Sequence, residues 1–571
     1  MEHSEEIINV LNINISKYLN NPKFGEDKKQ LLTKMLELIA KDIFNFKFIK
    51  EQNEYIDNLD LQELLSTLNE SKISQKKEGA YFTPKDVTEF IISNSFKHFL
   101  HQEKEYGNSI NDISIKLSHE NLSDRDKYKI LTAQVIDPTC GNGEFLLNAL
   151  RLKMKIYFST DLKAEDDLLT EIFSSFHGND MDEISITITK IRLLFEFIDI
   201  SMNNNQNVNY FELLYILTNN FVKFNFVVKE RIFNKNFDVV LGNPPFIEYR
   251  NIEYPTTNNF GNIYADCLKN SINLLSDGGV IGFIVPISFI STQRMSQIRN
   301  YVFSHTEDNI LLSFADRPDS LFNKAHQKLN IIFLKRSEKS CKEWLFTSNY
   351  NYWYSKERNQ LFNKVKIVRN DFTNEKFIPK IGTNIEKEVY SKVFANDSTL
   401  FQSSKELSLY NLLTSNDSEV SNIYINMRVG FWVKSLMEMP GSKEFKRFTV
   451  PKHLKYYTYA LLNSSLFFWY WTVVSDGWHI TNKELVHFKF IINEEYIEEL
   501  NKLSLELISK LEETKEYVGT KQTVYEYKHR KCKDVIDKIE TILGKIYNLS
   551  DREVDYIKRF ALKYRKGNGN V

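Results

Sequence analysis

A hydrophobic run in the middle of the chain ends in a rigid polar turn. Residues 237–241 are mostly apolar, and Gly242 is followed by an Asn-Pro-Pro-aromatic tetrapeptide made of Asn243, Pro244, Pro245 and Phe246. Proline cannot continue a β-ladder and restricts the residue before it, so we expect a buried strand that stops here. Ligands bind at the C-terminal edge of open α/β sheets. The run therefore predicts an α/β fold with two rigid acceptors beside an aromatic ring, although an ordinary surface turn could have the same composition.

A second predicted strand ends in a glycine-rich turn. Residues 135–146 read Val-Ile-Asp-Pro-Thr-Cys-Gly-Asn-Gly-Glu-Phe-Leu, which predicts a strand, a turn and the start of a helix. The glycines let the backbone approach a ligand closely, and the first turn of a helix has free N–H groups. Such a turn alone would also suit a dinucleotide. Its spacing, however, is neither that of the dinucleotide fingerprint nor that of a P-loop.

Two more candidate binding elements lie on either side of this turn in the sequence. Asp180 stands at the end of a third hydrophobic run, where an acidic side chain is expected to accept from ribose hydroxyls; capping of the next helix by Asp180 or Asp182 is the alternative. Upstream, residues 79–84 read Gly-Ala-Tyr-Phe-Thr-Pro and precede a helical pattern. Taken alone, Thr83 and Pro84 are a helix N-cap followed by proline at the first helical position.

These motifs together resemble amino methyltransferases that use S-adenosylmethionine. Residues 79–84 resemble motif X and residues 135–146 resemble motif I, and the order of the elements is similar to that of the gamma class of adenine-N6 DNA methyltransferases. The resemblance implies a Rossmann-like methyltransferase sheet. It also implies the catalytic residues Asn243, Pro244, Pro245 and Phe246 and the cofactor-binding residues Tyr81, Thr83, Asp137, Pro138, Gly141, Gly143, Phe145 and Asp180.

One position departs from the family pattern. Family members often carry Asp after the third strand, to accept from the adenine amino group of the cofactor, whereas Asn225 stands here. Its side-chain oxygen can still accept. Further on, residues 321–333 are similar to the segment that supplies a second aromatic ring against the target base. Phe322 is the candidate for that ring, and a plain core phenylalanine is the alternative.

The resemblance implies a specific chemistry. The exocyclic nitrogen of adenine is a poor nucleophile because its lone pair is delocalised into the ring. The Asn243 side-chain oxygen and the Pro244 carbonyl would accept its two N–H groups and free the lone pair for in-line attack on the methyl group. The base must first leave the duplex, and Phe246 would stack on it. Asn rather than Ser at position 243 favours adenine in this family.

Composition and charge set further expectations. No apolar run is long enough to span a membrane, the first residues are acidic rather than signal-like, and the four cysteines show neither metal-ligand nor disulfide spacing, so we expect a cytoplasmic protein without a metal site. The formal net charge is −1. It is unevenly distributed, with roughly −10 over residues 1–330 and roughly +9 over residues 331–571. The basic C-terminal part fits a double-stranded DNA partner.

The length of 571 residues predicts several domains. We expect a helical N-terminal segment over residues 1–75, a catalytic α/β domain over 76–335, an α+β target-recognition domain over 340–490 and a helical segment with long helices over 491–571. The aromatic run at 461–471 is expected in a core. Candidate DNA contacts in the target-recognition domain are Lys446, Arg447, Trp478 and His479, and for the basic pair an ordinary solvated surface is the alternative.

The sequence thus predicts a site-specific adenine-N6 DNA methyltransferase, the modification enzyme of a restriction–modification system. The main alternative is a modification subunit that is inactive without a separate specificity or nuclease subunit. RNA or protein-glutamine methylation uses the same tetrapeptide, but in usually much shorter enzymes. A DNA-binding subunit with a decayed site is the non-enzymatic alternative.

Overall fold

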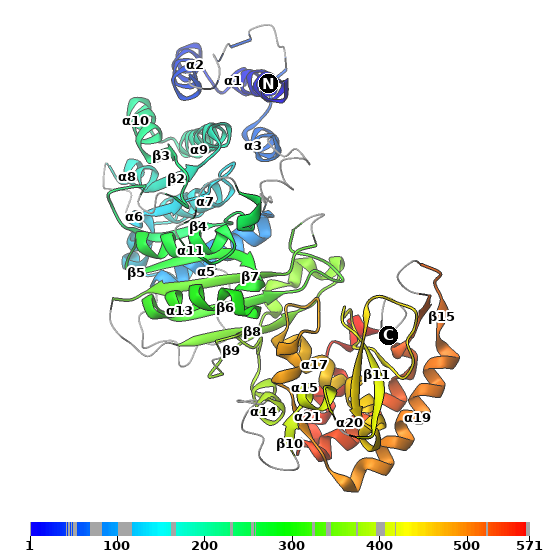
Figure 1. The fold of residues 1–571 in the computed structure, drawn as a ribbon. Coiled ribbons are helices and arrows are strands. Elements are labelled where there is room, and N and C mark those ends of the chain that lie inside the picture. Colours follow the sequence, from blue (N-terminus) through cyan, green and yellow to red (C-terminus); the bar gives the residue numbers. More distant parts are fainter. Residues whose placement is uncertain are drawn as a thin grey trace.

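The computed structural model describes residues 2–41, 43, 46, 48–49, 54–68, 83–100, 117–160, 167–228, 232–252, 256, 258–322, 326–338, 344–372, 375–394, 406–416, 418–520 and 524–566. Figure 1 shows two bodies, one built around a large sheet and one formed by the C-terminal part. Two hydrophobic cores correspond to them: the core of the sheet body draws on residues 7–378, and the core of the C-terminal body on residues 368–560.

The sheet body contains a mixed, mostly parallel sheet, as predicted. Its described strands follow the order β3-β2-β1-β4-β5-β7-β6-β8-β9. The pairs from β3 to β5 are parallel, and β7 is antiparallel to both of its neighbours. The strand bounds are β1 Val135–Asp137, β2 Phe176–Asp180, β3 Phe221–Lys223, β4 Phe237–Gly242, β5 Leu275–Pro286, β6 Thr306–Phe314, β7 Leu329–Arg336, β8 Leu345–Asn351 and β9 Ile367–Arg369.

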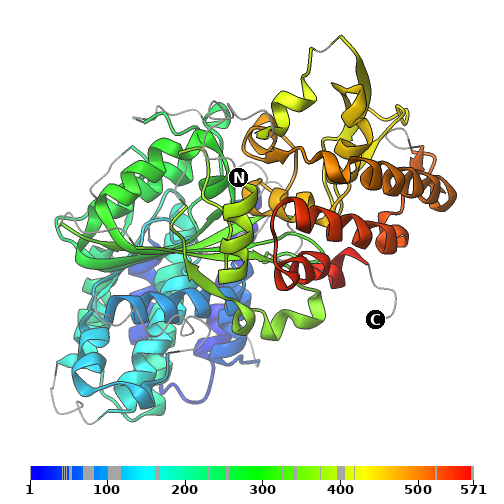
Figure 2. The same cartoon turned by 90° about the horizontal axis from the view of Figure 1, so that it is seen from below.

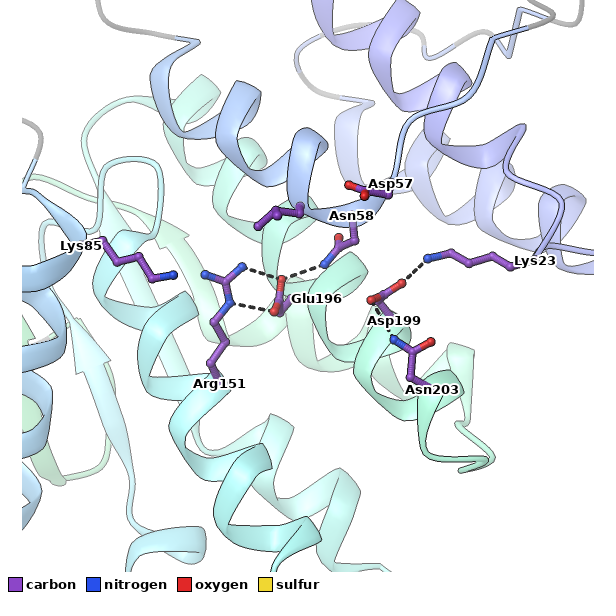
Figure 3. Close-up of a pocket in the computed structure, with 9 residues that line it drawn as sticks. Lys23, Asp57, Asn58, Lys85, Arg151, Glu196, Asp199 and Asn203 are labelled. Carbon is purple, nitrogen blue, oxygen red and sulfur yellow. Dashed lines mark hydrogen bonds and ion pairs between the residues drawn. The ribbon is translucent and has the colours of Figure 1, made fainter. Parts of the chain in front are cut away.

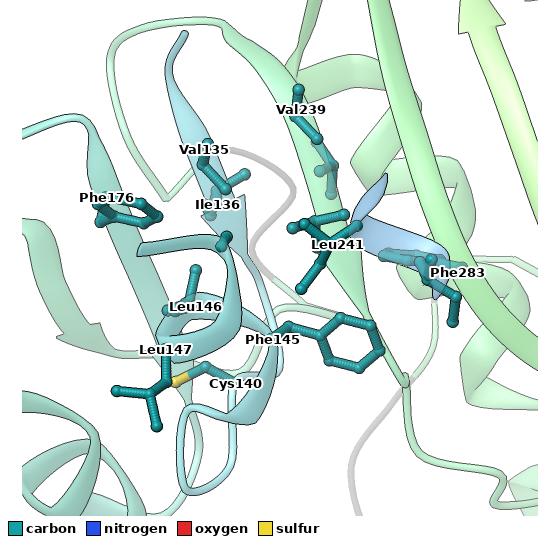
Figure 4. Close-up of a cluster of buried hydrophobic side chains, with 14 of the residues drawn as sticks. Val135, Ile136, Cys140, Phe145, Leu146, Leu147, Phe176, Val239, Leu241 and Phe283 are labelled. Atoms are coloured by element: carbon teal, nitrogen blue, oxygen red, sulfur yellow. The ribbon is translucent and has the colours of Figure 1, made fainter. Parts of the chain in front are cut away.

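The strand order reverses between β1 and β4. Chain connections leave such a point in opposite directions and open a crevice at the C-terminal strand ends. β1 and β4 are nearly continuous hydrophobic runs because both faces of a parallel sheet are covered. Figure 4 shows Val135 and Ile136 of β1 beside Val239 and Leu241 of β4 in this core. The two turns that the sequence singles out therefore meet at the crevice.

Helices cover both faces of the sheet. In Figure 2 the green helices of residues 263–305 lie above the sheet and blue and cyan helices lie below it. The helices of this body are α5 Lys85–Leu100, α6 Asp124–Thr132, α7 Glu144–Phe158, α8 Leu168–Ser174, α9 Glu183–Asn203, α10 Tyr210–Asn220, α11 Ile263–Leu274, α12 Ser288–Ser291 and α13 Ser296–His305. Short 3-10 helices are η2 His119–Asn121, η4 Tyr249–Asn251, η5 Gln293–Met295, η6 Ser355–Gln360 and η7 Phe362–Lys364.

The N-terminal segment is helical and joins the same core. Its helices are α1 Glu2–Leu19, α2 Glu26–Ala40 and α3 Asn58–Thr67. The side chains that recur at helical spacing are the buried ones, for example Leu11, Ile15 and Leu36. Contacts with α9 and α10 place these helices near the β3 end of the sheet (Figure 1).

The C-terminal body mixes helices with small sheets. Its helices are α14 Asn384–Val393, α15 Leu409–Leu413, α16 Lys455–Leu462, α17 Ser465–Val474, α18 Asn482–Val486, α19 Ile497–Thr514, α20 Lys533–Ile546, α21 Asp551–Arg559 and α22 Leu562–Arg565, with η8 Lys452–Leu454, η9 Glu494–Tyr496 and η10 His529–Cys532. Its strand groups are β10 Glu406–Ser408 with β14 Lys489–Ile491; β12 Ser435–Leu436, β11 Val420–Asn426 and β13 Phe445–Pro451; and β15 Glu516–Tyr517 with β16 Tyr525–Glu526.

Three details bear on the predicted segments. The central sheet continues past residue 335, because β8 pairs with β6 and β9 pairs with β8. The hairpin of β15 and β16 interrupts the last helical segment. The aromatic run spans the end of α16 and most of α17 and lies in the core, since each of its side chains is buried. In the part of the chain that the structure describes, no helix is both long and apolar enough to cross a membrane.

Candidate active site

The glycine loop, residues 138–143, connects β1 to α7. Gly141 and Gly143 have φ values of 50° and 80°, in the left-handed region that favours glycine. A Cβ at Gly141 would meet nothing within 4 Å, whereas one at Gly143 would lie 2.7 Å from Thr189 Cγ2. The backbone is therefore open at Gly141 and pressed against α9 at Gly143.

Hydrogen bonds hold the backbone of this loop in place. The Cys140 amide donates to the Asn179 carbonyl (2.8 Å), and the Gly141 amide donates to Asp180 Oδ2 (2.9 Å). Thr189 Oγ1 donates to the Gly141 carbonyl at 2.7 Å. The Pro138 carbonyl accepts from Asn179 Nδ2 at 2.9 Å. The end of β2 and helix α9 thus fix the shape of the glycine loop.

Two carboxyl groups converge on the loop. Asp137 is 1% exposed and accepts from the Thr139 amide, and burial raises the pKa of its carboxyl to about 8. Burial also raises the pKa of Asp180, whose other oxygen accepts from the Asp182 amide. Asp182 caps α9 by accepting from the amides of Ile184 and Ser185. The capping role therefore falls on Asp182, and Asp180 stays at the strand end beside Gly141.

The neighbouring strand ends carry the remaining candidates. Asn225 follows β3 and accepts from the Val227 amide through its side-chain oxygen (3.0 Å). Phe145 is buried and lies near Leu241 and Phe283 in Figure 4, so its ring belongs to the core behind the loop. Tyr81 lies outside the described residues.

Sequence reasoning overlooked two apolar side chains at this edge. Met181 after β2 and Phe224 after β3 are 52% and 39% exposed. Since β2 and β3 pair in parallel, these two residues lie at adjacent strand ends. The exposure of large apolar groups next to Asp180 is visible only in the folded chain.

The tetrapeptide begins at the end of β4, next to β1. Gly242 has φ 155°, and a Cβ there would lie 2.8 Å from Asp137 Oδ1, so the two strand ends approach closely. Asn243 Nδ2 donates to Thr83 Oγ1 at 3.1 Å, and Thr83 is only 4% exposed. With the amide nitrogen directed at Thr83, the amide oxygen lies on the opposite edge of the group.

An aromatic pair lies beside the tetrapeptide. The rings of Phe246 and Phe322 are nearly parallel, at 28°, with centroids 6.4 Å apart, and Tyr264 meets Phe246 edge-on at 6.3 Å. A planar base between two rings needs about 7 Å, twice the separation of carbon atoms in contact. The pair is therefore closed in this arrangement, and a base between the rings would require them to move apart. Phe322 is 1% exposed, so in this closed arrangement it is also part of the core.

The segment after the tetrapeptide is held by its own polar network. The Ile263 amide donates to the Ile247 carbonyl at 3.0 Å. Tyr249 Oη donates to Asp266 Oδ2 (2.5 Å), and Asn258 Nδ2 donates to Asp266 Oδ1 (2.8 Å). Asp266 is fully buried, and burial raises the pKa of its carboxyl. These contacts restrict the backbone that carries Phe246.

The predicted DNA-contacting residues occupy two places. Lys446 and Arg447 are exposed on β13. Trp478 lies where the two bodies meet: Lys328 Nζ of the sheet body is 3.2 Å from the centroid of its ring. His479 beside it is exposed. His479 forms an isolated bridge with Arg428, just after β11, and β11 is the strand that pairs with β13, so the two pairs lie on neighbouring segments of the C-terminal body.

Two arginines near Trp478 were not anticipated. Arg317 of the sheet body and Arg428 of the C-terminal body are both exposed, and each guanidinium lies 5.6 Å from the Trp478 ring centroid. Lys328 is buried and forms an ion pair with Asp316 (3.1 Å), and burial lowers the pKa of its amine to about 8. Arg428 also has Glu444 at 3.6 Å. The junction therefore presents cations from both bodies around one indole.

Comparisons with known proteins converge on one group. Residues 174–322 match the model of the Eco57I restriction-modification methylase family. The matched range contains Asp180, the tetrapeptide and Phe322. A predicted type II restriction enzyme and methyltransferase of Methanocaldococcus jannaschii is 29% identical, over 28% of this chain and 16% of that protein's length. The chain thus spans a small part of that curated relative.

A solved restriction-modification enzyme has a similar fold. The Type IIL restriction-modification enzyme MmeI, in complex with DNA, aligns with a TM-score of 0.51 at 10% identity, covering 97% of this chain and 92% of that chain. The DrdV–DNA complex aligns with a TM-score of 0.47 at 11% identity, covering 80% of this chain and 60% of that chain. At these identities, the likeness to MmeI is a likeness of fold.

Proposed function

We propose that the chain is a DNA methyltransferase that uses S-adenosylmethionine and acts on N6 of adenine. One observation carries the proposal: the Asn243 amide at the end of β4 is oriented by Thr83, beside the glycine loop and next to the Phe246–Phe322 pair. The match of residues 174–322 to a restriction-modification methylase model supports the methyltransferase class.

The residues at the crevice fit the proposed cofactor. Asp180 would accept from ribose hydroxyls, and the backbone at Gly141 leaves room for close approach. Met181 and Phe224 offer apolar contacts to an adenine ring, and Asn225 offers a polar one. When bound, S-adenosylmethionine supplies an electrophilic methyl group. Tyr81, Thr83, Asp137, Pro138, Gly143 and Phe145 remain proposed parts of this site, Phe145 through its backbone at the start of α7.

The tetrapeptide would prepare the nucleophile. The Asn243 side-chain oxygen and the Pro244 carbonyl oxygen accept the two N–H groups of the exocyclic nitrogen, which moves towards a tetrahedral geometry with its lone pair free. Preorganised acceptors need no rearrangement during the reaction, and this accounts for most of the catalytic effect. The proton can leave after methyl transfer. Phe246 and Phe322 would hold the flipped base between their rings.

The proposed substrate is double-stranded DNA. Lys446 and Arg447, exposed on β13, would contact phosphates, and Trp478 and His479 would contact DNA near the junction of the two bodies. The positive charge of residues 331–571 supports this partner. Adenine is favoured over cytosine by the asparagine at position 243, through the resemblance to the gamma class.

A second candidate keeps the chemistry and adds a partner. The chain aligns with only 16% of the length of the curated relative, whose name includes a restriction enzyme. A cognate restriction nuclease or a specificity subunit would then be a separate chain. In this alternative, the purified chain binds S-adenosylmethionine but does not methylate DNA alone.

The test is base-resolved methylation calling on DNA from cells that express the chain or its Asn243→Ala variant. We expect N6-methyladenine at one short motif, and a loss of at least about 100-fold in the variant, comparable to the loss of a preorganised catalytic group. DNA and cofactor binding by the purified variant serve as controls and should persist. Normal turnover by Asn243→Ala would contradict the mechanism, and the absence of any modified motif would favour the partner-dependent alternative.

A further inference from the structure

A buried polar seam connects the N-terminal segment to the glycine loop. It runs between α3, α7 and α9, and its side chains are Asn58, Gln62, Glu144, Arg151, Arg192 and Glu196. At the outer end, Arg151 forms two hydrogen bonds with Glu196, at 2.7 and 3.0 Å. This end opens into a polar cavity of about 490 Å³, where Lys23 also pairs with Asp199 (Figure 3). The inner end of the seam reaches the glycine loop.

Arg192 is the centre of the inner end. It is 2% exposed and donates in three directions: Nη1 to the Asn142 carbonyl (2.6 Å), Nη2 to Glu144 Oε2 (2.9 Å) and Nε to Gln62 Oε1 (3.0 Å). The planar fork of a guanidinium directs these three donors at fixed angles, which a lysine ammonium on its flexible stem does not. Arg192 therefore fixes a backbone carbonyl of the glycine loop and the first residue of α7 together.

Helix α3 completes this arrangement from the N-terminal segment. Gln62 Nε2 donates to the Arg192 carbonyl at 2.9 Å, while its oxygen accepts from the guanidinium, so the two residues grip each other reciprocally. At the end of α3, the carbonyls of Leu65 and Ser66 accept from Asn142 Nδ2, at 3.4 and 3.1 Å. These are carbonyls of the kind that a helix end leaves without an intrahelical partner. The loop residue Asn142 is thus held on both sides.

We propose that Arg192 is a positioning residue for the glycine loop and that α3, through Gln62, holds Arg192 in the orientation that S-adenosylmethionine binding requires. The inference rests on the proposed function, because it takes the glycine loop as the cofactor site. It assigns the N-terminal segment a role in cofactor affinity, through the contacts of α3 with Asn142 and Arg192. Gln62 lies on α3, outside the glycine loop, and is separated from Arg192 by 130 residues in the sequence.

The decisive comparison is between Gln62→Leu and Asn58→Leu in the full chain. Both residues are buried amides on α3, one helical turn apart, and each binds a charged side chain of α9. Of the two, Gln62 contacts Arg192, whereas Asn58 binds Glu196 and reaches Arg192 only through a long contact of its Oδ1 with Gln62 Nε2, at 3.4 Å. The affinity for S-adenosylhomocysteine, measured by isothermal titration calorimetry, should fall about tenfold in Gln62→Leu, the effect expected when a buried hydrogen-bond partner is lost. In Asn58→Leu it should stay within about twofold of the unmodified chain.

Further measurements keep the outcomes separate. Arg192→Lys retains the positive charge but not the planar guanidinium, and it should weaken S-adenosylhomocysteine binding as Gln62→Leu does. It takes the place of Gln62→Leu if that variant fails to fold. Hydrogen exchange at residues 139–147 should be faster in both than in Asn58→Leu. Unchanged affinity for S-adenosylhomocysteine in Gln62→Leu and Arg192→Lys, or an equal loss of affinity in Asn58→Leu, overturns this inference but leaves the proposed function standing. If the unmodified chain binds neither S-adenosylmethionine nor S-adenosylhomocysteine, both the proposed function and this inference are wrong.

Discussion

At the scale of single residues, the orientation of one amide depends on a contact that no local pattern predicts. Asn243 and Thr83 are 160 positions apart, and each stands in a recognisable motif. The sequence suggested Thr83 as a cofactor residue. In the folded chain its hydroxyl accepts from Asn243, because the start of α5 lies across the end of β4. The Thr83 hydroxyl would then orient the amide that binds the target amino group, in addition to its proposed role in the cofactor site.

A titratable residue at the same place gives the folded chain a predictable pH response. Burial raises the pKa of the Asp137 carboxyl from 3.8 to about 8. Between these values the folded chain holds a proton that the unfolded chain has released, so the contribution of this group to stability is complete below about pH 4 and lost as the pH rises through 8. Asp137→Asn removes the titration and keeps the oxygen that accepts from Thr139.

We therefore expect the melting temperature of the unmodified chain to fall relative to that of Asp137→Asn as the pH is raised from 5.5 to 8. The change in the free-energy difference is at most about 1.4 kcal/mol per pH unit. Calorimetry at several pH values without cofactor checks it. Asp124→Asn, on the exposed side of α6, is the control and should show no such trend. A constant difference between the unmodified chain and Asp137→Asn would contradict the prediction.

At the scale of elements, short-range sequence signals predicted the strands and turns that carry the site. β1 and β4 are continuous apolar runs that end in special turns, and these signals lie within a few residues of each other. β8 and β9 were not expected in the central sheet, because β8 joins it through a long-range pairing with β6, and β9 joins it by pairing with β8, in a segment rich in tyrosine and asparagine. For the same reason, the sequence could not predict that Arg317 and Arg428 meet at Trp478.

The loop that carries Trp478 yields a prediction at this scale. Its ring covers Lys328 and lies between arginines of the two bodies, so we expect Trp478→Ala to weaken DNA binding about tenfold while leaving cofactor affinity unchanged. Fluorescence anisotropy with a labelled duplex measures the first and calorimetry the second. Trp344→Ala is a matched control, because Trp344 also lies under an arginine, Arg369 at 4.3 Å, but at the sheet edge. Equal losses in both variants would count against a role of the junction in DNA binding.

At the scale of the whole molecule, the nearly neutral net charge conceals a separation of charge. The sheet body has an excess of acidic residues and the C-terminal part an excess of basic ones. Association with DNA phosphates releases counterions, so affinity falls with salt in proportion to the number of contacts. With DNA as the proposed substrate, the separation would favour an orientation in which the C-terminal body meets the phosphate backbone and the crevice meets the target base.

This gives a prediction for the double variant Lys446→Gln/Arg447→Gln. If both side chains contact phosphates, the slope of log affinity against log salt should become less negative by about 1.8, or about 0.9 for each contact. Titrations from low to moderate salt determine the slope. The pair Lys502→Gln/Lys545→Gln removes the same charge from α19 and α20 and should leave the slope nearly unchanged. Identical slopes for all three proteins would show that β13 does not contact the backbone.

The position of β7 between β5 and β6 has a consequence for synthesis on the ribosome. β6 is translated before β7 but does not pair with β5, so the edges of β5 and β6 that bind β7 stay open until residues 329–336 emerge and pair with both. Unpaired edges invite wrong partners. Phe322 lies on the link that closes this gap. The half of the crevice around the glycine loop can therefore assemble early, whereas the Phe246–Phe322 pair is completed only when β7 is inserted between β5 and β6.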